Sequence, residues 1–275
     1  MPSNREAYFQ ALSLNIPKSI IDFALKEVNG FDYLQLTKQF DDEIKDYALF
    51  MSAMKRYQNG EMIEYVFGET YFLSNPFTVN KNVLIPRQET EQLVLSTVDV
   101  IKQMFGDNPI SIADVCTGSG AIGISIAKAL PQNTYFLTDI SKEALRVAKT
   151  NASSLLENVN IKFFEGDMLE PLRGKHIDVL VCNPPYISNV DSIEKRTWEQ
   201  EPHLALLADP CTYFYEKVLR DFQNVMNEIC LLSFEIGEDM VDILTDLVKK
   251  YSPSSNYYFE KDLYGKTRFL FIKQL

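Results

Sequence analysis

The sequence Asn183-Pro184-Pro185-Tyr186 combines residue types that can bind an amide or an amine. The side-chain oxygen of Asn183 and the backbone oxygen of Pro184 are both acceptors, and together they can take both hydrogens of an –NH2 group. Tyr186 offers an aromatic face to a planar group or to a cationic methyl donor. The alternative is a simple strand-terminating turn, because Asn and Pro are common turn residues.

These four residues follow the apolar segment Ile177 to Cys182, which the pattern predicts to be a buried strand. Neither proline can donate a hydrogen bond to a sheet ladder, and each pushes the preceding residue toward extended backbone, so the strand must end there. The amide of Asn183 is therefore expected at the carboxyl end of a strand. In an open α/β sheet, ligands bind at that edge.

A glycine-rich turn from Asp114 to Gly120 joins an upstream strand to a helix that begins near Ala121. Glycine lets the backbone approach a ligand closely, and a helix start presents free N–H groups. Such a turn is weak evidence for a nucleotide site when it stands alone. The candidate cofactor-binding residues in it are Cys116, Thr117, Gly118, Ser119 and Gly120.

Acidic residues also follow the next two predicted strands. Asp139 lies about 20 residues after Gly118, the offset at which a carboxylate can bind a ribose diol. Asp167 is placed to accept from an adenine amino group, and Met168 to pack on the ring. For either aspartate alone, the alternative is a helix N-cap.

The set fits a nucleoside without a pyrophosphate. The turn lacks both the third glycine of a dinucleotide fingerprint and the Gly-Lys-Ser/Thr of a P-loop. S-adenosyl-L-methionine (SAM) is a ligand of this kind, and Asn183 is expected to contact it as well as the acceptor.

Alternating strand and helix patterns after residue 109 predict a mostly parallel sheet covered on both faces. The last two strands have no helix between them, so the final strand is expected to be antiparallel. The expected strands are 110–116, 134–138, 160–165, 177–182, 229–236, 256–260 and 268–272, and the expected helices are 120–130, 141–156, 212–227 and 238–251.

Residues 1–66 carry apolar stripes at helical spacing and are expected to form a small helical domain for substrate recognition. In it, Asn4 is expected to cap the first helix, and Pro17 and Gly30 to bound the second. Residues 67–88 are expected to be a β-hairpin linker, and residues 89–275 the α/β domain. The expected hairpin strands are Tyr65–Gly68, Tyr71–Phe72, Phe77–Val79 and Val83–Ile85.

The formal net charge of −11 argues against tight, sequence-independent binding of nucleic acid and favours a protein partner. No apolar run approaches the roughly 20 residues that span a bilayer, and the first residues show no signal pattern, so a cytoplasmic protein is expected. The four cysteines have no metal-type spacing and are expected to be reduced thiols, and no metal site is expected.

Taken together, these motifs resemble the HemK/PrmC family of protein-glutamine N5-methyltransferases, a family of class I SAM-dependent methyltransferases. The resemblance rests on Ile85-Pro86-Arg87 with Thr90-Glu91, on Asn183-Pro184-Pro185-Tyr186, and on Glu201-Pro202. It implies a Rossmann-like domain with a seven-stranded, mostly parallel sheet. It also implies methyl transfer from SAM to the side-chain nitrogen of the glutamine in the Gly-Gly-Gln motif of class I peptide-chain release factors, which modulates translation termination.

The sequence departs from the family pattern at several positions. Cys116 replaces the first glycine of the usual Gly-x-Gly-x-Gly turn, and Met168 stands where an aromatic residue is often found. Arg87, Thr90 and Glu91 are open to two interpretations. They either shape the acceptor pocket or form a structural link into the following helix, with Arg87 in a salt bridge.

Two other functions share part of this pattern. An adenine-N6 methyltransferase acting on DNA or RNA would bind the same –NH2 group, but the acidic charge disfavours it. A SAM-binding protein without catalysis is the second alternative, and the intact Asn183 to Tyr186 motif disfavours that.

Overall fold

The computed structural model describes all residues from Met1 to Leu275. The chain divides into two compact units, one made of Met1–Glu69 with Lys195–Gln200, the other of Thr70–Glu194 with Glu201–Leu275. None of the helices combines the length and the apolar character that crossing a membrane requires.

The smaller unit is helical, as predicted. Its helices are α1 (Asn4–Ser13), α2 (Lys18–Asn29), α3 (Tyr33–Lys38), α4 (Tyr47–Gln58), α5 (Ile63–Phe67) and the short α9 (Lys195–Gln200). Pro17 and Gly30 bound α2 as predicted. The prediction that Asn4 caps α1 is wrong, because Ser3 accepts from the Glu6 N–H and forms the cap. Asn4 is instead buried and accepts a hydrogen bond from Asn29 at 2.8 Å.

The predicted hairpin strand at Tyr65–Gly68 is also wrong, because Ile63–Phe67 forms helix α5. The side chains of Ile63, Val66 and Phe67 recur at helical spacing and all pack into the helical core, so burial of this face outweighs the strand propensity of the aromatic residues. The hairpin itself exists, as β1 (Glu69–Phe72) paired with β2 (Asn75–Thr78).

No strand forms at Val83–Ile85 either, although one was predicted there. Val83 and Ile85 are buried, which explains the apolar pattern. The Ile85 N–H, however, donates to the carboxylate of Glu201 at 3.1 Å instead of to a neighbouring strand. An apolar run therefore marks burial here without a sheet ladder.

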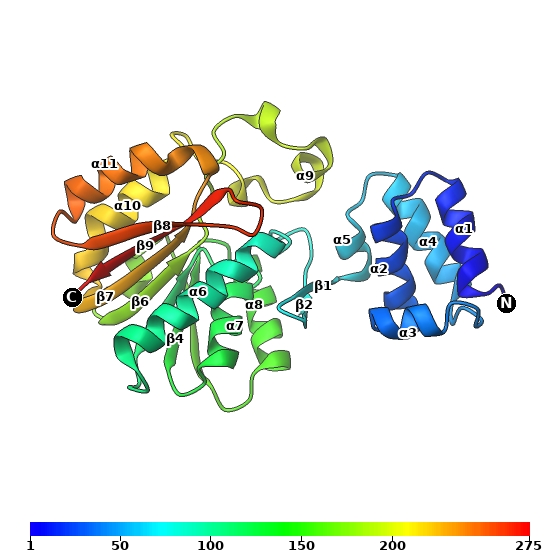
Figure 1. Cartoon of the computed structure of the whole chain (residues 1–275), viewed down its shortest axis with the longest axis horizontal. Coiled ribbons are helices and arrows are strands. Elements are labelled where there is room, and N and C mark those ends of the chain that lie inside the picture. Colours follow the sequence, from blue (N-terminus) through cyan, green and yellow to red (C-terminus); the bar gives the residue numbers. More distant parts are fainter. The chain divides into compact units, whose positions relative to one another are not determined.

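The larger unit contains the predicted seven-stranded, mostly parallel sheet, whose spatial order is β5-β4-β3-β6-β7-β9-β8 (Figure 1). Strand β9 runs antiparallel to both of its neighbours, as predicted. The strands are β3 (Ser111–Val115), β4 (Thr134–Asp139), β5 (Asn160–Glu165), β6 (Ile177–Cys182), β7 (Met226–Glu235), β8 (Asn256–Lys261) and β9 (Thr267–Gln274).

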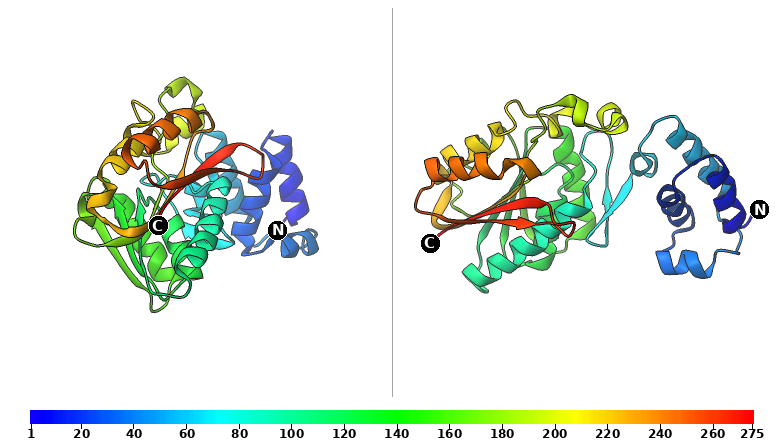
Figure 2. Two further views of the ribbon diagram at one scale, coloured as in Figure 1. Left: turned by 60° about the vertical axis from the view of Figure 1, so that its left-hand side comes forward. Right: turned by 45° about the horizontal axis from the view of Figure 1, so that its top comes forward.

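Helices cover both faces of this sheet, as Figures 1 and 2 show. Helices α10 and α11 lie on one face, and α6, α7 and α8 lie on the other. Their bounds are α6 (Gln88–Phe105), α7 (Ala121–Ala129), α8 (Lys142–Leu155), α10 (Tyr213–Asp221) and α11 (Val241–Tyr251). The helix predicted over 212–227 ends early at Asp221, because a 3-10 turn over Phe222–Asn224 leads directly into β7.

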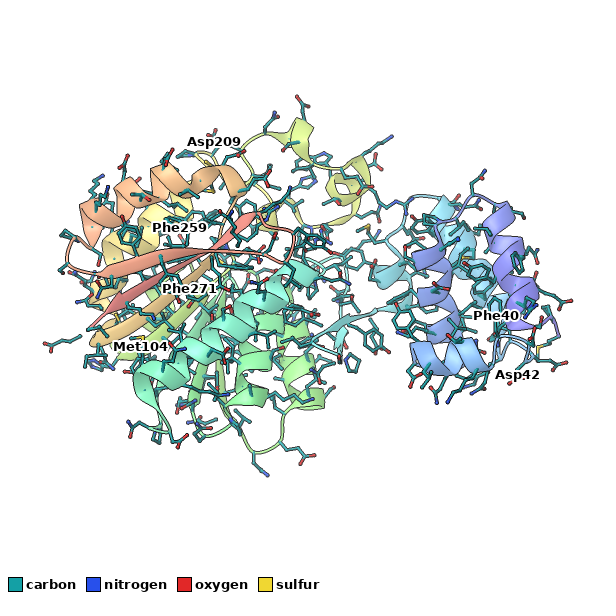
Figure 3. All side chains as sticks on the ribbon, in the orientation of Figure 1. Phe40, Asp42, Met104, Asp209, Phe259 and Phe271 are labelled. Atoms are coloured by element: carbon teal, nitrogen blue, oxygen red, sulfur yellow. The ribbon has the colours of Figure 1, made fainter.

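The core of the larger unit consists of two apolar clusters, one on each side of the sheet. Successive strand residues alternate between them, so Cys182 packs with α10 and α11, and Val181 packs with α6 and α7. Phe259 and Phe271, labelled in Figure 3, likewise belong to opposite clusters. This two-sided burial fixes the register of the strands and hence the positions of their carboxyl ends.

Candidate active site

The carboxyl ends of four parallel strands meet at one edge of the sheet. Val115 of β3 pairs with Thr138 of β4 on one side and with Cys182 of β6 on the other. This register places Cys116, Asp139 and Asn183 on adjacent strand ends, and the turn after β5 adds Asp167. The predicted binding edge therefore brings these side chains together.

A cavity of about 330 Å³ opens at this edge. Its walls come from the four strand ends, the start of α10, the irregular segment 82–84, and the segment 202–205, which contains a 3-10 turn over His203–Ala205. The residues that line it are Asn82, Val83, Leu84, Cys116, Gly118, Thr138, Asp139, Ile140, Ser141, Ala144, Gly166, Asp167, Met168, Asn183, Pro185, Pro202, Leu204, Ala205, Tyr213 and Phe214.

Most of the predicted site residues line this cavity, but not all of them. The predicted residues that line it are Cys116, Gly118, Asp139, Asp167, Met168, Asn183 and Pro185. Thr117, Ser119, Gly120 and Pro184 are buried beside it, and Tyr186 is half-buried. The cavity thus exposes alternate residues of the glycine-rich turn.

Asp139 is held rigidly by backbone donors. One carboxylate oxygen accepts from the Gly118 N–H at 2.9 Å, and the other accepts from the Ser141 N–H at 2.8 Å. Burial raises the pKa of Asp139, and these backbone hydrogen bonds oppose that rise. The Asp139 carboxylate also lines the cavity and retains acceptor capacity toward hydroxyl groups there.

Asp114 has a structural role beneath the turn. Its Oδ2 accepts from the Thr117 hydroxyl at 2.5 Å and from the Gly123 N–H at 2.9 Å. Its other oxygen is buried without a hydrogen-bond partner. Burial raises the pKa of Asp114 to about 7. Thr117 is therefore engaged in holding the turn onto the start of α7.

Cys116 occupies the left-handed backbone region, with φ of +61°. That conformation suits glycine far better than a residue with a Cβ, which accounts for the glycine usual at this position. The Cys116 sulfur lies 3.5 Å from the Met168 sulfur and hydrogen-bonds with the Cys182 thiol. Burial raises the pKa of Cys182, so this thiol stays protonated and packs as an apolar group.

Asp167 and Met168, in the turn after β5, both line the cavity. The Asp167 carboxylate forms an ion pair with Lys217 of α10, and both side chains keep part of their surface exposed. Met168 is buried, with φ of +51°. Lys217 was not predicted to reach this site, because its contact depends on how α10 packs.

Asn183 lies beside a buried carboxylate that the sequence analysis did not identify. Glu235 is the last residue of β7. Because Cys182 of β6 pairs with Phe234 of β7, the residues that follow them, Asn183 and Glu235, are neighbours at adjacent strand ends. Glu235 accepts a hydrogen bond from the Thr90 hydroxyl at 2.6 Å, and the Asn183 amide is near enough to lower the pKa of its carboxyl group. The Tyr186 hydroxyl lies 3.5 Å from its other oxygen. The sequence signal that could have revealed Glu235 was an acidic residue within the otherwise apolar segment 229–236.

Arg87, Thr90 and Glu91 form contacts that connect segments distant in the sequence. Arg87 pairs with the buried carboxylate of Glu201, so its salt bridge exists, while Thr90 bonds Glu235 and caps no helix. Glu91 accepts from the Leu73 N–H at 2.8 Å and thereby anchors the β1–β2 turn.

The segment 202–205 over the cavity is fixed at both ends. Glu201 holds one end through the Ile85 N–H and Arg87. At the other end, the Ile187 N–H donates to Leu206, and the Ala208 N–H donates to Ile187. The segment 202–205, which lines the cavity, is therefore connected by hydrogen bonds both to the segment before α6 and to Ile187, the residue that follows the Asn183 to Tyr186 motif.

Comparison with known proteins gives consistent matches. Residues 92–200 match the family described as methyltransferase small domain. The release factor glutamine methyltransferase of Bacillus anthracis is 34% identical over 229 residues, covering 82% of this chain and 80% of that protein. The corresponding proteins of Enterococcus faecalis (35% over 255 residues, 90% and 89%) and Flavobacterium psychrophilum (37% over 213 residues, 76% and 74%) are similarly related.

Among solved structures, a crystal structure of the human Mettl16 catalytic domain in complex with the MAT2A 3′UTR hairpin 1 matches with a TM-score of 0.59. It is 14% identical, and the match covers 98% of this chain and 91% of that one. A methyltransferase from Pyrococcus furiosus matches with a TM-score of 0.53 at 14% identity, covering 81% and 98%. At such low identity these likenesses concern the fold alone.

The sheet order, the helices on both faces and the cavity at the carboxyl edge define a class I, Rossmann-like methyltransferase. Within that class, identities above 30% over most of both chains show the particular family. The chain belongs to the release factor glutamine methyltransferases.

Proposed function

We propose that this protein transfers a methyl group from SAM to the side-chain amide nitrogen of a glutamine in class I peptide-chain release factors, in their Gly-Gly-Gln motif. The observation that supports this most directly is the position of Asn183. It lines the edge cavity next to the carboxyl end of β3, where its amide can meet both a cofactor and an acceptor. The names of the relatives point to the same acceptor.

The residues around the cavity fit the nucleoside of SAM. Asp139 can accept from a ribose diol, and Asp167 can accept from an adenine amino group. Met168 and Ile140 offer apolar surface to a planar ring, since both line the cavity. When bound, SAM supplies a methyl group that its sulfonium already activates for displacement.

The chain must then make a poor nucleophile attack. The nitrogen lone pair of a glutamine amide is delocalised, so orientation and charge stabilisation are the available means of catalysis. Asn183 Oδ1 and the Pro184 carbonyl would each accept one N–H of the target amide and orient its nitrogen toward the cavity. Their pull on these hydrogens favours charge on nitrogen more in the transition state than in the ground state.

Recognition of the release factor requires surface beyond the cavity. We assign this role to the helical region 1–66, which contains no cluster of catalytic residue types. Several large apolar side chains there are exposed, among them Phe9, Tyr33 and Leu34. Exposed apolar side chains of this kind are suited to contact with a protein, and the acidic charge of the chain favours the same class of partner.

A methyl-transfer assay with three acceptors tests this proposal. Purified protein and SAM labelled in the methyl group are incubated with a class I release factor, with adenine-containing nucleic acid, or with neither. The proposal expects label on the release factor only, and mass spectrometry should map one added methyl to the glutamine of the Gly-Gly-Gln motif. Label on adenine, or SAM binding without transfer to any acceptor, would contradict it and support one of the two alternatives.

A further inference from the structure

Glu235 at the end of β7 lies beside Asn183 at the end of the neighbouring strand β6. Glu235 is 4% exposed, and three side chains from different parts of the chain reach it. Thr90 comes from α6, while Asn183 and Tyr186 come from the motif after β6. Arg268 of β9 contributes a nearby positive charge. A buried carboxylate with several donors is a fixed point in the site.

An asparagine side chain has two chemically opposite ends. The oxygen accepts hydrogen bonds and the NH2 group donates them, and rotation by about 180° exchanges the two in the same space. An acceptor of the target NH2 hydrogens must present its oxygen. If Asn183 were rotated the other way, two NH2 groups would face each other, and neither could accept.

The neighbouring carboxylate removes this ambiguity. Burial raises the pKa of Glu235, while the Thr90 hydroxyl, the Arg268 charge and the Asn183 amide oppose that rise. In its ionised form the carboxylate only accepts hydrogen bonds, so it selects the orientation in which the Asn183 NH2 group points at Glu235. The Asn183 oxygen then points away from Glu235. Thr90 and Tyr186 are both hydroxyl donors, and they hold the carboxylate in place from other directions.

We propose that Glu235 is a positioning residue that orients the Asn183 amide so that its oxygen faces the nitrogen to be methylated. This inference rests on the proposed function, because it assumes an –NH2 acceptor at Asn183. Glu235 does not itself touch the substrate in this scheme. Its effect is on the fraction of molecules in which Asn183 presents an acceptor.

The test uses the Glu235→Gln variant in single-turnover methyl transfer, with SAM binding measured separately by calorimetry. Glutamine has nearly the same size, but its NH2 group can bond the Asn183 oxygen and so stabilises the rotated amide as well. We expect the single-turnover rate to fall at least about tenfold, with the SAM Kd within about threefold of wild type. An unchanged rate in a folded Glu235→Gln protein would overturn the proposal.

A matched control makes the same substitution at another carboxylate that accepts from side-chain donors. Glu260 of β8 accepts from the Ser96 hydroxyl at 2.6 Å and from the Gln92 amide at 3.2 Å, and it does not line the cavity. We expect Glu260→Gln to keep its single-turnover rate within about threefold of wild type. A loss of rate equal to that of Glu235→Gln would assign Glu235 a general structural role instead.

The double variant Glu235→Gln with Asn183→Asp gives a readout that a structural role would not move. In this protein the NH2 group of the introduced glutamine donates to one oxygen of the introduced aspartate, and the other oxygen remains an acceptor toward the substrate. The double variant should therefore be several-fold faster than the Asn183→Asp variant, in which two carboxylates repel each other. If the single-turnover rate of the double variant falls by the product of the losses in the two single variants, the proposal is contradicted.

Two further comparisons keep the outcomes separable. If Glu235→Gln does not fold, thermal melting of Asn183→Asp against Asn183→Ala decides the contact. The aspartate variant should melt lower, because it places a second carboxylate against Glu235, and equal melting would contradict the contact. If wild-type protein transfers no methyl to any –NH2 acceptor, the proposed function fails, whereas failure of this inference requires an active wild type.

Discussion

Glu201 Oε1 accepts a hydrogen bond from the Ile85 N–H at 3.1 Å, and the same carboxylate pairs with Arg87. This buried carboxylate joins the segment before α6 to the segment 202–205, and residues of both line the cavity. The walls of the cofactor site therefore depend on one side chain that lies outside it.

Replacing Glu201 with alanine should weaken cofactor binding and stability together. The variant leaves the Ile85 N–H without its partner and Arg87 without its counter-charge, which we expect to cost about 2 kcal/mol of unfolding free energy. Because the 202–205 segment loses one anchor, the SAM Kd should rise about tenfold. Urea denaturation and calorimetry measure the two effects.

Glu143→Ala serves as the control for this change. Glu143 forms an exposed i,i+3 pair with Arg146, which contributes little. Its removal should leave the unfolding free energy and the SAM Kd unchanged within error. If Glu201→Ala behaves in the same way, the link between the two segments does not support the cavity.

Asp139 should contribute directly to cofactor affinity. Asparagine at this position has one oxygen only, so either the Gly118 N–H or the Ser141 N–H loses its acceptor, and the lone pairs available to a ribose diol are fewer. We expect Asp139→Asn to raise the SAM Kd by about 10- to 100-fold with a small change in melting temperature. Asp191→Asn, on an exposed turn, is the control. Equal SAM affinity in both variants would exclude Asp139 from the site.

Cys116 should carry a conformational cost that glycine relieves. At φ of +61° a Cβ is unfavourable, so Cys116→Gly should be about 1 kcal/mol more stable than Cys116→Ala, which keeps the strain and also lacks the thiol. SAM affinity of the glycine variant should equal or exceed that of wild type. If the alanine variant is the more stable of the two, the backbone conformation at Cys116 differs from the one described here.

Asp114 should make stability fall as the pH rises. Its pKa in the folded protein, about 7, lies above the value of about 4 in an unfolded chain, so the folded state binds more protons between these two pH values. The unfolding free energy therefore decreases through this range. Between about pH 5.5 and about pH 8, wild type should lose roughly 2 kcal/mol relative to Asp114→Asn. If the unfolding free energies of the two proteins change with pH in parallel, the raised pKa assigned to Asp114 is contradicted.

The sequence predicted the five central strands well because burial on both faces produces long apolar runs of β-branched and aromatic residues. The edge strands β5 and β8 are partly exposed and were recognised by their β-branched and aromatic residues. The sequence also predicted which strand ends carry polar groups, since Cys116, Asp139 and Asn183 directly follow apolar runs. The error at Tyr65–Gly68 arose because the aromatic residues favour a strand, while the helical spacing of Ile63, Val66 and Phe67 spans too few residues to stand out in the sequence.

Contacts between distant segments could not be predicted in the same way. Thr90 and Glu235 are separated by 145 residues, and Ile85 and Glu201 by 116. Which side chain meets which depends on sheet register and helix packing, and neither is encoded in local periodicity. The motifs Ile85 to Glu91 and Glu201-Pro202 were visible in the sequence, but their roles required the fold.

The most direct test of the central claim is single-turnover methyl transfer by Asn183→Ala to a class I release factor, with SAM binding measured on the same preparation. We predict that the rate of the chemical step falls at least about 100-fold, because one acceptor of the target amide is lost, while the SAM Kd changes by less than about fivefold. Loss of SAM binding together with an unchanged chemical step would contradict the account, since Asn183 would then hold the cofactor and not the nitrogen.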